Sequence, residues 1–144
     1  NTDEDEGPIG YNLNSICNYP VQSISADLMF LAMVTVWRRV KALNLRSKLR
    51  LQVHDSLVWD CPKEEVFIVS KICTDVFENL PQLSKAYFGW EIEVPLTSEV
   101  AIGRTYGDLI CEFKADEVTP DRINGYILSE EFVKSFKKCL DTAA

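Results

Sequence analysis

The alternation of apolar and polar positions divides the chain into segments typical of helices and strands. A first helix is predicted to begin near Pro20, because proline suits the first helical position, and to end near Leu43-Asn44. Its apolar residues form two stripes: Val21, Ile24, Leu28, Leu31 and Thr35 in one, and Met29, Ala32, Met33 and Val36 in the other. A helix that is apolar on most of its faces is expected to be central and buried.

A strict alternation follows this helix. Between Lys48 and His54, every second residue is apolar, which is typical of a half-buried strand. Ser56 to Cys61 has the character of a second strand. The sequence therefore predicts an antiparallel hairpin with His54-Asp55-Ser56 at its turn.

The rest of the chain predicts a second helix, another strand and a tail. The second helix begins at Pro62 and has an apolar stripe that is expected to face the core. From Glu91 to Ile102 apolar and polar residues alternate again, as in a strand, and Pro95 indicates an edge strand or a bulge. After Gly103 we expect a polar tail with a late helix, Ser129 to Leu140. The predicted class is α+β: an antiparallel sheet packed on one face by two long helices.

The amino-acid composition indicates the class of protein and the compartment in which it works. The 144 residues are 47% hydrophobic and 26% charged, values ordinary for one soluble domain. The net charge is −7, yet the segment from Pro20 to Gln52 has six basic residues and one acid, Asp27, a balance of +5. Five scattered cysteines without a C-x-x-C pair indicate a reducing compartment rather than a disulfide or zinc framework. The apolar run from Leu28 to Trp37 is shorter than the roughly 20 residues of a membrane span.

Asp55 is the residue on which a catalytic interpretation depends. A carboxylate at a tight turn is held rigidly, and Mg²⁺ prefers such oxygen ligands together with substrate phosphates. Aspartate is equally common at turns for local hydrogen bonding, and His54 beside it could be structural. Asn18 and Gln22, four residues apart near a helix start, could be capping groups. The residues themselves leave these alternatives open.

Three blocks in order carry a resemblance. They are "NYPVQSISADLMFLAM" from Asn18, "LQVHDSLVWDCPKEE" from Leu51 and "VPLTSEVAIGRTYGDL" from Val94. The chain resembles the C-terminal palm region of family A, polymerase I-like DNA polymerases, over about Asn14 to Leu109, with the phage-encoded members nearest. The resemblance implies a palm-type sheet with a catalytic hairpin in residues 18–109, preceded by an acidic polar segment 1–17 and followed by an extension 110–144.

The resemblance also implies roles for particular residues. Asp55 matches the catalytic aspartate that shares a pair of Mg²⁺ ions with a second aspartate, and His54 matches a residue at the primer terminus. Asn18, Gln22 and Gln52 correspond to polar side chains facing the minor groove of the primer–template. A donor there checks the shape of a base pair without reading its sequence. The reaction is attack of the primer 3′-hydroxyl on the α-phosphate of a deoxynucleoside triphosphate, releasing pyrophosphate.

The sequence departs from the family pattern at three points. Ser56 stands where many members have glutamate, and Asn14 where arginine is frequent. Neither a D-Y/F-S-Q-I/L-E block nor an R-x-x-x-K helix is present, so the second aspartate and the nucleotide-gripping fingers helix are absent. We therefore expect a piece of a longer polypeptide or one half of a split polymerase, with the fingers, thumb and second aspartate supplied from elsewhere. Its partners would be that remainder, primer–template DNA and deoxynucleotides, in the cytoplasm (of the host cell if phage-encoded) and not at a membrane.

Three alternatives to a DNA polymerase remain open from the sequence. A non-catalytic DNA- or protein-binding module that kept the palm shape would also lack the second aspartate. A single-subunit RNA polymerase is a variant of the catalytic class, because H-D-S at the hairpin occurs there too. A generic α+β domain with an accidental His-Asp turn would carry neither of the paired blocks.

Overall fold

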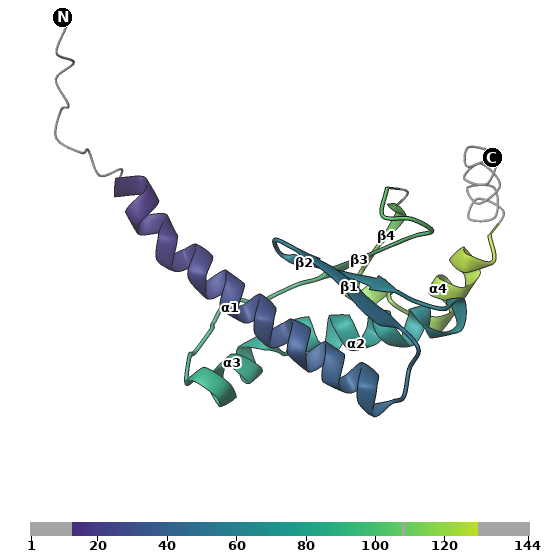
Figure 1. Ribbon diagram of the computed structural model, residues 1–144, viewed down its shortest axis with the longest axis horizontal. Helices are drawn as coiled ribbons and strands as arrows, with labels where there is room; N and C mark the ends of the chain where they lie inside the picture. Colours follow the sequence, from purple (N-terminus) through teal and green to yellow (C-terminus); the bar gives the residue numbers. More distant parts are fainter. Residues whose placement is uncertain (1–12, 108, 130–144) are drawn as a thin grey trace, which may run out of the picture.

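The α+β class is confirmed by a computed structural model that describes residues 13–107 and 109–129 (Figure 1). The elements are α1 (Leu13–Ala42), β1 (Lys48–Val53), β2 (Ser56–Asp60), the short 3-10 helix η1 (Lys63–Glu65), α2 (Val66–Glu78), α3 (Leu80–Phe88), β3 (Glu99–Gly103), β4 (Leu109–Lys114), the 3-10 helix η2 (Ala115–Glu117) and α4 (Pro120–Ile127). Most of the predicted segment 1–17 and nearly all of the predicted helix Ser129 to Leu140 lie outside the described residues.

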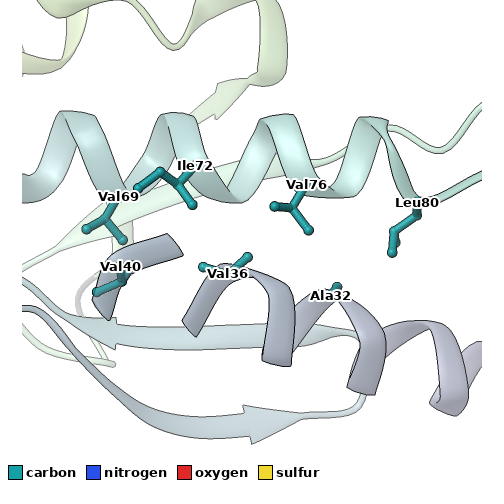
Figure 2. Close-up of a cluster of buried hydrophobic side chains, with 7 residues drawn as sticks. All are labelled: Ala32, Val36, Val40, Val69, Ile72, Val76 and Leu80. Atoms are coloured by element: carbon teal, nitrogen blue, oxygen red, sulfur yellow. The ribbon is translucent and has the colours of Figure 1, made fainter. Parts of the chain in front are cut away.

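The main core lies between α1 and α2. Figure 2 shows Ala32, Val36 and Val40 of α1 facing Val69, Ile72, Val76 and Leu80 across the helix interface. The α1 residues recur at intervals of four, so they form one narrow stripe that α2 and the start of α3 cover. Trp59 and Cys61, at the end of β2, pack against the same cluster and join the hairpin to the helices.

α1 differs from its prediction in length and in burial. It begins at Leu13 and includes Pro20, although the expected start was near Pro20 itself. Only one face is buried: residues of the second apolar stripe pack inside, whereas Val21 and Ile24 of the first are 64% and 45% exposed. The prediction of a helix buried on most faces is therefore wrong for this chain in isolation.

The length of α1 also bears on the membrane question. From Ile16 to Ala42 the helix is long and apolar enough to span a bilayer. Its most apolar stretch has a mean hydropathy of 1.3, and 17% of that stretch is buried in the structure. This is longer than the run from Leu28 to Trp37 considered from the sequence. A helix from the core of a larger soluble protein satisfies the same length and composition test, so the observation is weak evidence for a span.

The described residues form two separate two-stranded sheets instead of the single sheet that was predicted. β1 pairs with β2 and β3 pairs with β4, both antiparallel. The strand expected from Glu91 begins only at Glu99. The segment expected as a polar tail contains β4 and α4, which enclose a second core with β3 against the start of α2; its buried members are Ile102, Phe113, Val118, Ile123 and Ile127.

Hydrogen bonds to the Glu65 carboxylate connect the loop after α1 to the start of α2. Its carboxylate accepts hydrogen bonds from the Ser47 hydroxyl (2.6 Å), the Ser47 backbone N–H (2.8 Å) and the Arg46 backbone N–H (3.0 Å). These bonds, the Ser47 hydroxyl first among them, lower the pKa of Glu65 from 4.5 to about 2. Three donors favour the ionised form because hydrogen bonds to a carboxylate are stronger than those to a neutral carboxyl group.

We expect these hydrogen bonds to make the folded chain less stable in acid. The folded pKa lies below the unfolded one, so the Glu65 contribution is present above pH 4.5 and is lost as the pH falls toward 2. Replacing Glu65 with glutamine should lower the urea midpoint at neutral pH and flatten its decline across that window. Glu64→Gln is the control, because the Glu64 side chain is 75% exposed and makes one 3.4 Å contact with Arg46. Equal pH profiles for the two variants would contradict the assignment.

Candidate functional site

The β1–β2 hairpin ends in a two-residue turn made of His54 and Asp55. Val53 is the register partner of Ser56, so no other residue lies between the strands. His54 has a φ of 51°, in the left-handed region that suits the first position of tight hairpin turns. Histidine enters this region more readily than most residues other than glycine, asparagine and aspartate. The predicted turn at His54-Asp55 is therefore present, with a strained backbone at its first residue.

Two side chains hold this turn through its carbonyl groups. The Gln52 amide Nε2 donates to the carbonyl oxygen of His54 at 2.9 Å. The Ser56 hydroxyl donates to the carbonyl oxygen of Val53 at 2.8 Å. From the sequence, Ser56 was noted only as a position without the glutamate of many family members, and its hydrogen bond to Val53 was not predicted. The one signal for it was a serine directly after a two-residue turn, where a hydroxyl reaches the backbone three residues earlier.

Asp55 presents an exposed carboxylate from this fixed turn. Within the described part of the chain the carboxylate makes no hydrogen bond or ion pair. In residues 13–107 and 109–129 no group of three or more His, Cys, Asp and Glu side chains is placed to hold a metal ion. A carboxylate oxygen is the kind of ligand that Mg²⁺ takes in proteins, so the chemistry of Asp55 fits a single ligand of such an ion.

Asn18 and Gln22 lie on the N-terminal half of α1. They are four residues apart, so they project from the same side of the helix, and both are exposed. In both figures the hairpin runs back along α1, and its turn is directed toward the N-terminal half of the helix. The structure brings Gln52, His54 and Asp55 together at the turn. It forms no hydrogen bond between that group and the Asn18–Gln22 pair in the described residues.

The same helix exposes a large apolar surface, which includes Val21 and Ile24 of a stripe predicted to be buried. Its exposed apolar residues are Ile16, Tyr19, Val21, Ile24, Phe30, Val34 and Trp37. A groove of about 300 Å³ lies between α1 and α3, lined mostly by apolar side chains together with Asp27, Thr35 and Arg38. Large exposed apolar surfaces are typical of sites that contact another protein, a ligand or a membrane.

The basic strip between Pro20 and Gln52 is only partly neutralised. Arg50 pairs with Asp60 at 2.9 Å across the base of the hairpin, and Arg46 pairs with the two glutamates of η1. Arg38, Arg39 and Lys48 are exposed and make no ion pair in the described residues. Part of the positive charge of this segment therefore stays unpaired in the described residues, near the hairpin and the C-terminal end of α1.

Comparison with known proteins identifies the class. Residues 11–108 match the family described as DNA polymerase family A. The DNA polymerase of Bacillus phage SP01 is 32% identical over 114 residues, 79% of this chain and 12% of that protein. DNA polymerase I of Caldicellulosiruptor bescii is 40% identical over 94 residues, and the thermostable DNA polymerase I of Thermus thermophilus is 38% identical over 89. The comparison with solved structures found no match.

The chain belongs to DNA polymerase family A, and the resemblance seen in its three sequence blocks is confirmed. It spans 12%, 10% and 9% of the lengths of these three relatives. The blocks at Asn18, Leu51 and Val94 all begin within the matched residues. The individual roles of the residues in them remain predictions.

Proposed function

We propose that this chain is the C-terminal palm segment of a DNA-directed DNA polymerase, which adds deoxynucleotides to a primer 3′-end. The observation that carries the proposal is the Asp55 carboxylate: exposed, unpaired in the described residues and fixed on a two-residue turn within the family-matched region. Residues 18–109 would form half of the palm, and residues 110–144 an extension.

In this mechanism the chain supplies position and negative charge. Asp55 would hold one side of a two-ion Mg²⁺ site, and a second aspartate from the rest of the polymerase would hold the other. Bound Mg²⁺ would supply charge neutralisation at the reacting phosphate and activation of the 3′-hydroxyl. His54, exposed beside Asp55, would contact the primer terminus and keep that hydroxyl in line with the α-phosphate.

Asn18, Gln22 and Gln52 would check the new base pair. Purine N3 and pyrimidine O2 accept hydrogen bonds in the minor groove of every correct pair, so amide donors there sense its shape without reading its sequence. The exposed amides of Asn18 and Gln22 are available for this. The unpaired cations of the basic strip would add contacts to phosphates.

The exposed apolar face of α1 is consistent with packing against the rest of the polymerase. Fingers, thumb and the second aspartate would come from the same polypeptide or from another chain. Packing of that remainder on Ile24, Phe30 and Trp37 would bury surface that is 45%, 52% and 47% exposed here. Such an enzyme works where DNA is replicated, which is the cytoplasm of the cell or of the phage-infected host.

The native assembly tests this proposal. A tag on this chain should co-purify a polypeptide with the second aspartate and the lysine-bearing helix, unless both lie on the tagged polypeptide itself. The purified assembly should extend a DNA primer in Mg²⁺ with deoxynucleotides in preference to ribonucleotides. A tagged assembly that binds DNA or protein but extends no primer would support the non-catalytic module instead. Preference for ribonucleotides would indicate an RNA polymerase.

Gln22 provides a narrower prediction. Replacing it with alanine removes one minor-groove donor and should lower the efficiency of correct nucleotide addition about 3- to 10-fold, as expected for one hydrogen bond. Ser23→Ala, at an exposed neighbouring position on another side of α1, is the control. Steady-state kinetics on a matched primer–template provide the measurement. Equal efficiencies for the two variants would remove Gln22 from the DNA contact set.

A further inference from the structure

The hydrogen bonds of Gln52 and Ser56 hold the two backbone carbonyl groups that immediately precede Asp55. The carbonyl that Gln52 binds belongs to His54, so it lies in the peptide plane that connects His54 to Asp55. The carbonyl that Ser56 binds belongs to Val53, the register partner of Ser56 at the base of the turn. Together the two bonds restrain the chain immediately before the turn and within it.

This turn needs such restraint more than most. His54 is held at a φ of 51°, a conformation that costs a residue with a side chain on the order of 1 kcal/mol. The hairpin is two-stranded in the described residues, and isolated two-stranded hairpins are marginally stable. The residues from His54 to Ser56 are exposed, so no packing against the core fixes them. Beyond the pairing of Val53 with Ser56, the Gln52 hydrogen bond opposes rotation of the His54–Asp55 peptide, and the Ser56 hydrogen bond restrains the peptide before it.

We propose that Gln52 and Ser56 are positioning residues that fix the direction of the Asp55 carboxylate, an inference that rests on the proposed function of Asp55. The Ser56 hydroxyl restrains the turn through the Val53 carbonyl. Gln52 uses one of its two amide N–H bonds in the turn, which leaves the other for DNA.

Loss of either bond should affect metal use before it affects DNA binding. A peptide that rotates freely spreads the carboxylate over several directions, so the fraction of time in the productive position falls. A lower productive fraction raises the apparent dissociation constant for the ligand by the same factor. The requirement for Mg²⁺ should increase. Affinity for the primer–template should stay the same when the Ser56 hydroxyl is removed, because Ser56 has no proposed contact with DNA.

The test compares Ser56→Ala and Gln52→Met in the assembled polymerase, with Ser56→Thr as the matched variant that keeps a hydroxyl. Methionine has nearly the shape of glutamine and no amide donor. Ser56→Ala and Gln52→Met should each raise the Mg²⁺ concentration for half-maximal extension about 3- to 10-fold, as expected from one hydrogen bond. Primer–template affinity should be unchanged in Ser56→Ala, whereas Gln52→Met also removes the N–H that is proposed to contact DNA. Ser56→Thr should match the wild type.

Hydrogen exchange without metal or DNA provides the second readout. In Ser56→Ala and Gln52→Met, the backbone amides from His54 to Leu57 should exchange faster, while those of α2 should be unchanged. This separates loss of turn restraint from general unfolding.

The outcomes separate the inference from the proposed function. Unchanged Mg²⁺ dependence and exchange in both variants, with Asp55→Ala inactive, would overturn the inference and leave the proposed function standing. Weaker primer–template binding by Gln52→Met at an unchanged Mg²⁺ requirement would assign Gln52 to DNA and overturn its positioning role. Normal extension by Asp55→Ala would overturn the proposed function itself.

Discussion

Asp55→Ala is expected to lower nucleotide addition by the assembled polymerase about 1,000-fold or more, because the loss of a metal ligand removes several kcal/mol of transition-state stabilisation. Primer–template affinity should remain close to that of the wild type, since DNA contacts are spread over other residues. Single-turnover extension in Mg²⁺ and a DNA-binding titration measure the two quantities separately.

The matched control is Asp60→Ala, at the far end of the same hairpin. Asp60 is an exposed aspartate whose carboxylate pairs with Arg50, and exposed pairs of this kind contribute at most about 1 kcal/mol. Extension by this variant should stay within a few-fold of the wild type. Near-normal extension by Asp55→Ala, or an equal loss in both variants, would contradict a specific role for Asp55.

The second large effect is expected at Ile123, whose side chain is fully buried in the core that α4 and β4 form with β3. Ile123→Ala should destabilise the chain by about 2–5 kcal/mol, through lost burial and the cavity left behind. A typical domain has only about 5–15 kcal/mol of stability, so this loss is a large fraction of the total. Urea unfolding followed by tryptophan fluorescence provides the measurement.

Leu128→Ala tests the specificity of that effect. Leu128 follows α4 directly and is 81% exposed, so its truncation should change stability by less than about 0.5 kcal/mol. A similarly small effect at Ile123 would mean that the second core does not form. Residues after 108, beyond the family match, would then be separate from the fold.

Local patterns predicted the hairpin and the helix that follows it. The alternation around Leu49, Leu51 and Val53 and the polar pair after it placed both strands within a residue of their observed ends. Pro62 and the acids after it marked the start of η1 and α2. These signals succeed because turn chemistry and helix-terminal charge act within a few residues of sequence.

The start of α1 was mispredicted because of Pro20. An interior proline lacks an N–H and leaves the carbonyl four residues earlier without its partner. Here that carbonyl belongs to Ile16, which is exposed, so water can satisfy it and the helix continues. Val21 and Ile24 belong to a stripe that the sequence predicts to be buried, but they are 64% and 45% exposed. Apolar periodicity identifies one face of a helix and does not show whether another element of the chain covers that face.

The separation into two sheets depends on pairing that sequence patterns do not carry. Glu91 to Ser98 alternates as a strand does, yet no partner strand is present for it in the described residues, and β3 begins at Glu99 where β4 pairs with it. Which residues oppose each other across β3 and β4 is set by the second core, with Ile102 and Phe113 on its inner side. At the site, the family blocks pointed to Asp55, whereas the restraint by Ser56 depends on a distance that only the structure gives.

The central claim is that this hairpin contributes Asp55 to a metal site shared with the rest of a polymerase. Fe²⁺ substituted for Mg²⁺ in the assembled polymerase, with ascorbate and peroxide, generates radicals that cut the polypeptide beside the bound ion. If Asp55 binds the ion, a cut is expected between Leu51 and Leu57 that excess Mg²⁺ suppresses and that Asp55→Ala eliminates. Cuts elsewhere in the chain with none at the hairpin, or a hairpin cut that persists in Asp55→Ala, would contradict it.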